Sequence, residues 1–188
     1  MALVISGRIV PLDRADPDAV FKGRVFLDDS GDVERVLAET GLDATCLEFE
    51  LTESMLVEET PELMRTMDGL RALGVKLAID DFGTGHSSLA HLKRFRIDKL
   101  KIDRTFVRDI ATDPDDRAIT AAIVDLARNM GITSIAEGVE SEAQLEFLLE
   151  RGCDEMQGYL TSRPVPAADI AAFVRRAGCG RLEAVNGG

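Results

Sequence analysis

The chain has 188 residues, of which 45% are hydrophobic, and its formal net charge is -12 at pH 7. This length predicts a single domain with a buried core, and no apolar run comes near the roughly 18 residues of a membrane-spanning helix. The negative charge excludes a DNA or RNA groove over the whole surface, but not a phosphate ligand, because bound metal ions invert the local charge.

Strand-like and helix-like segments alternate along the first half of the chain. Residues 23–28 and 46–52 are short apolar stretches typical of strands. A helix is predicted over 61–73, because its leucines and methionines recur on one face at helical spacing. Two further strand candidates follow at 75–80 and 97–102, with helix candidates between the strands.

The second half continues the alternation. Residues 115–130 place apolar side chains along one stripe of a helix, and a strand candidate follows at 132–136. A capping-box pattern, Ser-Glu-Ala-Gln, opens a predicted helix over 141–152. The last strand candidate covers 154–158, and one more helix is predicted over 166–178.

Repeated strand–helix units predict parallel strands with helices outside them. Two folds satisfy this order, an open doubly wound sheet and a TIM-type (β/α) barrel. No Gly-x-Gly-x-x-Gly follows the first good strand, which weakens the case for a nucleotide-binding open sheet. Polar residues end many of the strands and favour the barrel, whose active site is built at that face.

Carboxylates gather at the predicted strand exits. Five consecutive strands deliver polar side chains there: Glu50 and Glu53, Asp80 and Asp81, Lys101 and Asp103, Glu137 and Glu140, and Gln157. Adjacent ionised carboxylates repel one another unless a positive charge lies beside them. Neither histidine is at a strand exit, and an all-oxygen set suits magnesium, manganese or calcium rather than zinc.

Each of these residues also has an ordinary structural interpretation. The aspartate pair can be a loop acid beside a helix cap, and Lys101 can be a solvated charge at a strand end. Asp103 can cap a following helix. Glu53 and Glu140 can be first-turn acids, and Gln157 can be structural.

Five segments, in order, resemble the signatures of the EAL domain family: Glu50-Leu-Thr-Glu53, Asp80-Asp-Phe-Gly-Thr-Gly85, Leu100-Lys-Ile-Asp103, Ala136-Glu-Gly-Val-Glu140 and Gln157-Gly-Tyr-Leu160. Members of this family are bacterial phosphodiesterases that open cyclic di-GMP (c-di-GMP) to the linear dinucleotide pGpG. The resemblance extends over three quarters of the chain. It implies that reaction, a cofactor of two Mg²⁺ or Mn²⁺ ions, and a homodimer.

The resemblance also implies two sets of residues at the reacting centre. The metal-binding carboxylates would be Glu50, Asp80, Asp81 and Glu137. The catalytic residues would be Lys101, Glu137 and Gln157. Lys101 would hold the attacking water and offset phosphate charge, and Asp80 would bridge the two ions. Glu137 would hold a metal ion, accept a proton, or do both.

Further residues would act around this centre. By the resemblance, Glu53 anchors the loop over residues 82–88, which shapes the second metal site and contributes to dimerisation. Arg163 and Pro164 would hold the guanine end of the ligand, and Glu140 would also contact substrate.

The N-terminal part of the chain departs from the family pattern. Residues 1–31 contain no Glu-Ala-Leu, whose glutamate binds metal in the family, and Asp28 would replace the usual asparagine ligand. A complete barrel takes roughly 250 residues, so we predict an incomplete barrel of about six or seven strands. We divide the chain into an atypical segment 1–31, an EAL-like core 32–178 and a flexible tail 179–188. Either the segment 1–31 or a second subunit would seal the gap in the barrel.

Three functions remain open on this basis. The first is c-di-GMP hydrolysis, weakened by the missing glutamate, and it is favoured because the later catalytic positions are all kept. The second is a catalytically degenerate c-di-GMP receptor or protein-interaction module. The third is another magnesium-dependent barrel, such as an enolase-like lyase, which the Asp-Asp-Phe-Gly loop fits poorly.

The cysteines bear on the location of the protein. Cys46, Cys153 and Cys179 have neither metal-ligand spacing nor an even disulfide framework, which predicts the reducing cytoplasm. The apolar start of the chain is too short for a signal peptide and lacks its basic opening. The predicted partners are c-di-GMP and a second copy of the chain.

Overall fold

A computed structural model describes residues 30–53, 60–85, 89–166 and 169. The elements in these residues are α1 (Ser30–Thr40), η1 (Ala44–Cys46), β1 (Glu48–Thr52), α2 (Pro61–Ala72), β2 (Lys76–Phe82), α3 (Leu89–Phe95), β3 (Lys99–Ile102), α4 (Arg104–Arg108), α5 (Pro114–Met130), β4 (Thr133–Glu137), α6 (Glu142–Arg151) and β5 (Glu155–Gln157). None of these helices is long and apolar enough to cross a membrane.

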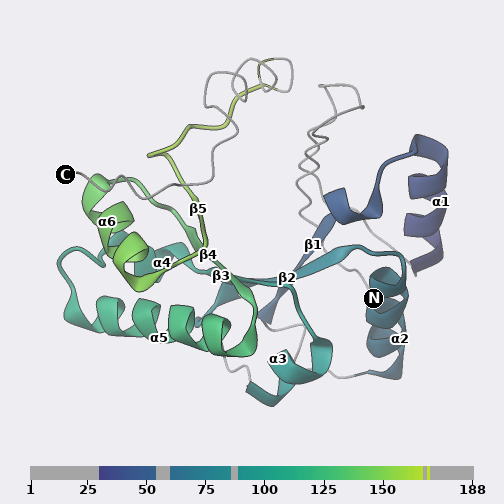
Figure 1. The fold of residues 1–188 in the computed structure, drawn as a ribbon, viewed down its shortest axis with the longest axis horizontal. Helices are drawn as coiled ribbons and strands as arrows, with labels where there is room; N and C mark the ends of the chain where they lie inside the picture. The colour runs from purple at the N-terminus through teal and green to yellow at the C-terminus, as the bar shows by residue number, and fades with distance from the viewer. Residues whose placement is uncertain (1–29, 54–59, 86–88, 167–168, 170–188) are drawn as a thin grey trace.

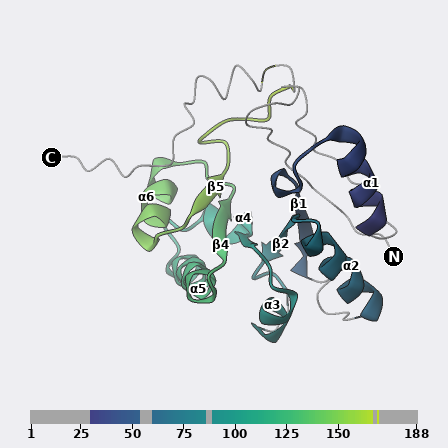
Figure 2. The same cartoon turned by 45° about the vertical axis from the view of Figure 1, so that its right-hand side comes forward.

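The strands form one parallel sheet in the order β1-β2-β3-β4-β5. An open doubly wound sheet reverses its order at a switch point, whereas each strand here pairs with the next along the chain, as in a TIM-type barrel. Figures 1 and 2 show α2, α3, α5 and α6 around the outer side of the strands. The predicted α/β fold, an incomplete TIM-type barrel, is confirmed, and the open-sheet alternative is wrong.

Alternation along the strands separates an apolar outer face from a polar inner face. In β1, Phe49 and Leu51 are buried in the core shared with the helices, whereas Glu48 and Glu50 point to the opposite face. Other fully buried strand residues of the same core are Leu77, Ile79, Leu100 and Ile102. Since the apolar face holds the helices, the charged side chains lie inside the barrel.

The helix ends follow capping signals in the sequence. Ser141 and Gln144 make both hydrogen bonds of the capping box at the start of α6. Gly131 and Gly152 end α5 and α6 with φ of 69° and 74°, a left-handed conformation that glycine adopts without steric cost. The three predicted helices in the described part of the chain are confirmed to within one residue at each end.

Other predicted elements need correction or lie outside the described residues. The helices α1, α3 and α4 were expected between the strands only in general terms, without bounds; α3 and α4 have seven and five residues, too few to show helical periodicity. The strand predicted from residue 46 begins at Glu48, because Ala44–Cys46 form a 3-10 turn capped by Asp43. The predicted strand 23–28, almost all of the helix over 166–178 and the tail lie outside the described residues, so the domain boundaries and the full strand count stay predictions.

Candidate metal centre and active site

Strands β1 to β4 bring one lysine and three carboxylates into contact inside the barrel. Lys101 Nζ, on β3, lies 2.8 Å from Glu50 Oε1 of β1 and 2.8 Å from Asp80 Oδ1 of β2. The same nitrogen lies 2.7 Å from Glu137 Oε1 of β4. The Lys101 side chain is only 6% exposed. The structure thus joins four residues that the sequence places at four different strand exits.

The ionic contacts decide the protonation state of Lys101. Burial by itself lowers the pKa of this ammonium group, because water no longer solvates the charge. The negative charge of Glu137 and the contacts with Asp80 and Glu50 outweigh burial and raise the pKa of Lys101 above its ordinary value. Lys101 is therefore a fixed cation at physiological pH.

Carboxylates nevertheless outnumber cations at this centre. Oxygen atoms of Asp80, Asp81 and Glu137 all lie within 4.8 Å of one another. Among the described residues, Asp80 Oδ1 is buried and has the ion pair with Lys101 but no hydrogen bond of good geometry. A hard divalent cation with oxygen ligands would add positive charge beside this oxygen and those of Asp81 and Glu137. The donor set fits Mg²⁺, Mn²⁺ or Ca²⁺.

An irregularity in β2 brings Asp81 into the cluster. Successive side chains of a regular strand point to opposite faces, so Asp80 and Asp81 would diverge. The register between β2 and β3 shifts between Ile79 and Phe82, and Asp81 adopts a left-handed φ of 54°. Aspartate enters this region more readily than most residues. The bulge lets two consecutive carboxylates serve one site.

Asp103, which directly follows β3 and caps α4, supports Asp81. Burial, a hydrogen bond with Asp103 and the charges of its acidic neighbours raise the pKa of Asp81 to about 6. Burial also raises the pKa of Asp103, but hydrogen bonds from Thr105 and Asp81 outweigh it and lower that pKa. The Thr105 backbone N–H donates to Asp103 Oδ1 at 2.8 Å. Below about pH 6, the proton held by the two aspartates is therefore on Asp81 rather than on Asp103.

We expect cation binding at this centre to weaken as the pH falls through about 6. Asp81 must release its proton to bind a cation, so protons compete with metal below its pKa of about 6. The folding stability of the cation-free chain changes with pH in the opposite direction. Because folding raises the pKa of Asp81, its proton stabilises the folded state at low pH, and this contribution is lost as the pH rises from about 4 to about 6.

Calorimetric titration with Mn²⁺ between about pH 5 and pH 8 checks this dependence. The variant Asp81→Asn provides the control, because it should bind Mn²⁺ weakly and with little change across the range. Equal wild-type affinity at the two ends of the range would contradict the assignment of the proton to Asp81.

Glu53 connects β1 to the turn after Asp81. This buried carboxylate accepts hydrogen bonds through Oε2 from the N–H groups of Gly83, at 3.1 Å, and Gly85, at 2.9 Å. A Cβ at Gly85 would lie 2.9 Å from Glu53 Cδ, so the turn needs a glycine there to approach so closely. These contacts support the predicted role of Glu53 as a loop anchor.

Replacing Glu53 by alanine should destabilise the fold by about 2–4 kcal/mol, because two partly buried N–H groups lose a charged acceptor. Urea unfolding measures this change, and Mn²⁺ affinity should fall with it, since the turn begins beside Asp81. Glu62→Ala, at an exposed site on α2, is the matched control. A Glu53→Ala variant as stable as the control would refute the anchoring role.

The remaining predicted residues lie at the edge of the cluster or beyond it. Gln157, exposed on β5, is the register partner of Glu137. Glu140 is exposed and lines a separate cavity of about 370 Å³ beside Arg104 and Arg108. Asp28 lies outside the described residues.

The segment after β5 carries the other two predicted ligand contacts. The Arg163 guanidinium stacks on the exposed ring of Tyr159, 4.7 Å from its centroid, and Pro164 is also exposed. Neither Arg163 nor Pro164 is part of the carboxylate cluster. Tyr159 was not predicted as a site residue; an aromatic residue two positions after Gln157 was the available signal. Asp103 was predicted only as a helix cap, which it is for α4, and its contact with Asp81 was missed.

Fold and site together define a class: a parallel barrel with an acidic, oxygen-only cation site at the carboxyl ends of its strands. The model of the EAL domain family matches residues 27–164. The chain belongs to the EAL domain family. This result confirms the family resemblance on which the predicted residues were chosen.

Individual relatives agree with this assignment. The cyclic di-GMP phosphodiesterase NbdA of Pseudomonas aeruginosa is 45% identical over 153 residues, which cover 81% of this chain and 19% of the relative. An uncharacterized protein of Sinorhizobium fredii, y4lL, is 44% identical over 76% of this chain and 17% of its own length. The chain spans about a fifth of the length of the curated relatives it matches.

Solved structures show the same fold with ligands. The phosphodiesterase PaMucR, in complex with c-di-GMP, has a TM-score of 0.71 and 44% identity, over 74% of this chain and 57% of that chain. The manganese and c-di-GMP complex of Klebsiella pneumoniae BlrP1 has a TM-score of 0.66 and 39% identity, over 71% of this chain and 34% of that chain. Structural relatives of this domain therefore bind both a divalent metal and the dinucleotide.

Proposed function

We propose that this domain hydrolyses c-di-GMP to linear pGpG with two divalent metal ions, Mg²⁺ or Mn²⁺. One observation carries the proposal: a buried lysine contacts three carboxylates from three strands, and an oxygen of a fourth carboxylate, Asp81, lies within 4.8 Å of oxygens of Asp80 and Glu137. This arrangement belongs to a chain of the EAL domain family. Binding of metal and c-di-GMP by structural relatives supports the same reaction.

The cation-binding residues would be Glu50, Asp80, Asp81 and Glu137. The ions, when bound, would polarise the phosphate and acidify a water molecule. Lys101 supplies a fixed positive charge that stabilises the additional negative charge on the phosphate in the transition state. Asp103 and Glu53 hold Asp81 and the turn after it in place.

Glu137 is also the candidate proton acceptor. Burial raises its pKa, and the charges of Asp80 and Glu50 add to this effect, although Lys101 opposes it. A carboxylate with a raised pKa accepts a proton from water more readily than an ordinary one. Gln157, the register partner of Glu137 on β5, would orient the water.

Substrate contacts and assembly form the outer part of the proposal. Arg163 and Pro164 would hold the guanine end, and the stacking of Arg163 on Tyr159 shows that this guanidinium already packs against a flat ring. Glu140 would contact the ligand from the loop after β4, and Asp28 would complete the metal ligands. A homodimer and a cytoplasmic location remain predictions from the sequence.

The test is incubation of the purified chain with c-di-GMP and Mg²⁺ or Mn²⁺, followed by chromatography for pGpG. We expect pGpG to form, and excess chelator to stop its formation, because the carboxylate cluster alone cannot activate water. If c-di-GMP binds tightly and no pGpG forms above the chelated control, the catalytic proposal is wrong. Tight binding without turnover would then favour the receptor function.

A further inference from the structure

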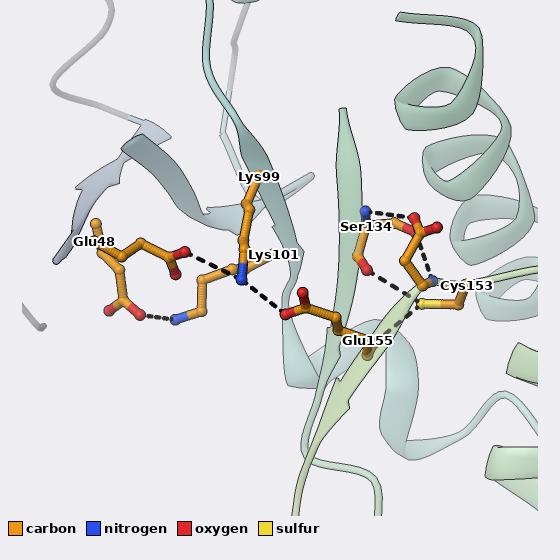
Figure 3. A network of polar contacts seen from close by, with 8 residues as sticks. Glu48, Lys99, Lys101, Ser134, Cys153 and Glu155 are labelled. Carbon is orange, nitrogen blue, oxygen red and sulfur yellow. Dashed lines mark hydrogen bonds and ion pairs between the residues drawn. The ribbon is translucent and has the colours of Figure 1, made fainter. Parts of the chain in front are cut away.

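A second ionic cluster lies inside the barrel, and the proposed reaction does not use it. Lys99 Nζ on β3 lies 3.1 Å from Glu48 Oε2 of β1 and 2.8 Å from Glu155 Oε2 of β5. The side chains of Lys99 and Glu48 are 17% and 18% exposed, whereas Glu155 is 47% exposed. Figure 3 shows Lys99 between the two glutamates, with Lys101 beside it.

This cluster connects strands that do not pair with one another. In the described sheet β1 and β5 are the edge strands, and β3 is central. Neighbouring strands are about 4.8 Å apart, so each edge strand lies roughly 10 Å from β3 along a flat sheet. One nitrogen, Lys99 Nζ, contacts glutamates of both edge strands at about 3 Å. Both contacts together require the sheet to curl toward its inner face. Lys99 therefore connects both edge strands, β1 and β5, to the central strand β3.

Both tied strands carry residues of the proposed active site. Residues two apart on a strand share a face, so Glu50 lies on the same face as Glu48 and Gln157 on the same face as Glu155. The strand β5 has three residues and pairs only with β4 among the described strands. Without Lys99, the position of Gln157 relative to β3 would depend on backbone pairing through β4, and that of Glu50 on pairing through β2 and on its own contact with Lys101.

We infer that Lys99, with Glu48 and Glu155, positions Glu50 and Gln157 for cation binding and hydrolysis, by fixing the curvature of the sheet. The inference rests on the proposed function and extends it to residues that are not ligands. Lys99 is a positioning residue, because its charge contacts Glu48 and Glu155 rather than the carboxylates around Lys101.

A purely electrostatic role and a positioning role of Lys99 predict opposite changes in Mn²⁺ affinity when Lys99 is replaced. Removing a cation near an acidic centre makes its potential more negative, so a purely electrostatic role implies tighter Mn²⁺ binding. Loss of positioning implies weaker binding, because β1 and β5 each lose one contact that fixes them relative to β3 and Glu50 is then held near the other ligands by Lys101 and backbone pairing only. Supporting residues of metal sites typically contribute 10–100-fold to affinity. The sign of the change therefore separates the two roles.

The experiment compares Lys99→Met and Lys99→Arg with the wild-type chain. Calorimetric titration gives the Mn²⁺ affinity, and thermal melts in chelator give stability. We expect Lys99→Met to bind Mn²⁺ about tenfold more weakly or worse. Lys99→Arg, which keeps the charge and the reach, should restore affinity to within about threefold of wild type. Lys93→Met, at an exposed position on α3, should match wild type.

Unchanged or tighter Mn²⁺ binding by Lys99→Met would overturn the inference, as would failure of Lys99→Arg to restore affinity. If Lys99→Met does not fold, Glu155→Gln tests the β5 contact at a half-exposed site. That variant should lower kcat for pGpG formation several-fold with little change in KM, and unchanged kcat would overturn the inference. The Mn²⁺ titrations need no turnover, so an inactive wild-type chain refutes the proposed function without deciding the role of Lys99.

Discussion

Asp80→Asn is expected to reduce Mn²⁺ affinity by at least about 100-fold, the largest binding loss of any single substitution in this domain. Asp80, like Glu137, both contacts Lys101 and belongs to the carboxylate cluster with Asp81. Its Oδ1 is buried and short of hydrogen-bond donors. Asparagine keeps the shape of the side chain but removes the negative charge that would attract a hard divalent cation.

The same change should have little effect on folding before metal is added. The centre holds more carboxylates than cations, so removing one negative charge relieves repulsion while Lys101 keeps its contacts with Glu50 and Glu137. Calorimetric titration and a thermal melt of the same sample separate the two effects. Asp125→Asn, at an exposed site on α5, is the control. Wild-type affinity in Asp80→Asn would disprove the ligand assignment.

Lys101→Met is expected to have the opposite profile, with metal binding retained and hydrolysis lost. Removing a cation does not weaken an acidic metal site, whereas loss of a preorganised charge at the phosphate typically slows turnover by about 100- to 1,000-fold. The variant should also be less stable in chelator, by about 3–5 kcal/mol, because Glu50, Asp80 and Glu137 lose their shared counter-ion.

Mn²⁺ should therefore raise the melting temperature of Lys101→Met more than that of the wild-type chain, since the metal replaces the missing positive charge. Turnover is followed by chromatography for pGpG at saturating Mn²⁺. Lys76→Met, an exposed lysine of β2, controls for the loss of a strand lysine. Turnover within about threefold of wild type would show that Lys101 does not act on the phosphate.

The two variants together distinguish a metal-binding role from a catalytic one. Asp80→Asn should lose both Mn²⁺ and turnover, whereas Lys101→Met should lose turnover alone. If both lose Mn²⁺ equally, Lys101 acts by holding the carboxylates together rather than by contacting the phosphate. That alternative has a structural basis, because Lys101 contacts carboxylates from three strands.

Local patterns in the sequence were sufficient for the strands and for the ends of the longer helices. Each strand is marked by alternation or by an apolar run, and Ser141 and Gly152 mark α6 through hydrogen bonds within a few residues. The short helices α3 and α4 contain too few turns for a periodic pattern. A local pattern also cannot show that Ala44–Cys46 form a 3-10 turn instead of extending β1.

In the candidate site, too, some features were predictable from the sequence and others depend on the fold. The sequence placed Glu50, Asp80, Lys101 and Glu137 at strand exits, and parallel pairing brings those exits together. The resemblance named Asp81 as a metal ligand, but the sequence did not show how its side chain reaches the site, because that depends on a bulge between β2 and β3. It also did not predict that Asp103 shares a hydrogen bond with Asp81.

By itself, then, the sequence determined the order of elements, the family, and the chemistry of the residues at the strand ends, because these depend on spacing along the chain. Only the tertiary structure decided which charges meet. Lys101 contacts three carboxylates and Lys99 contacts two others, although both lysines share one strand. The difference depends on the register and curvature of the sheet, which set how far each side chain must reach across the barrel.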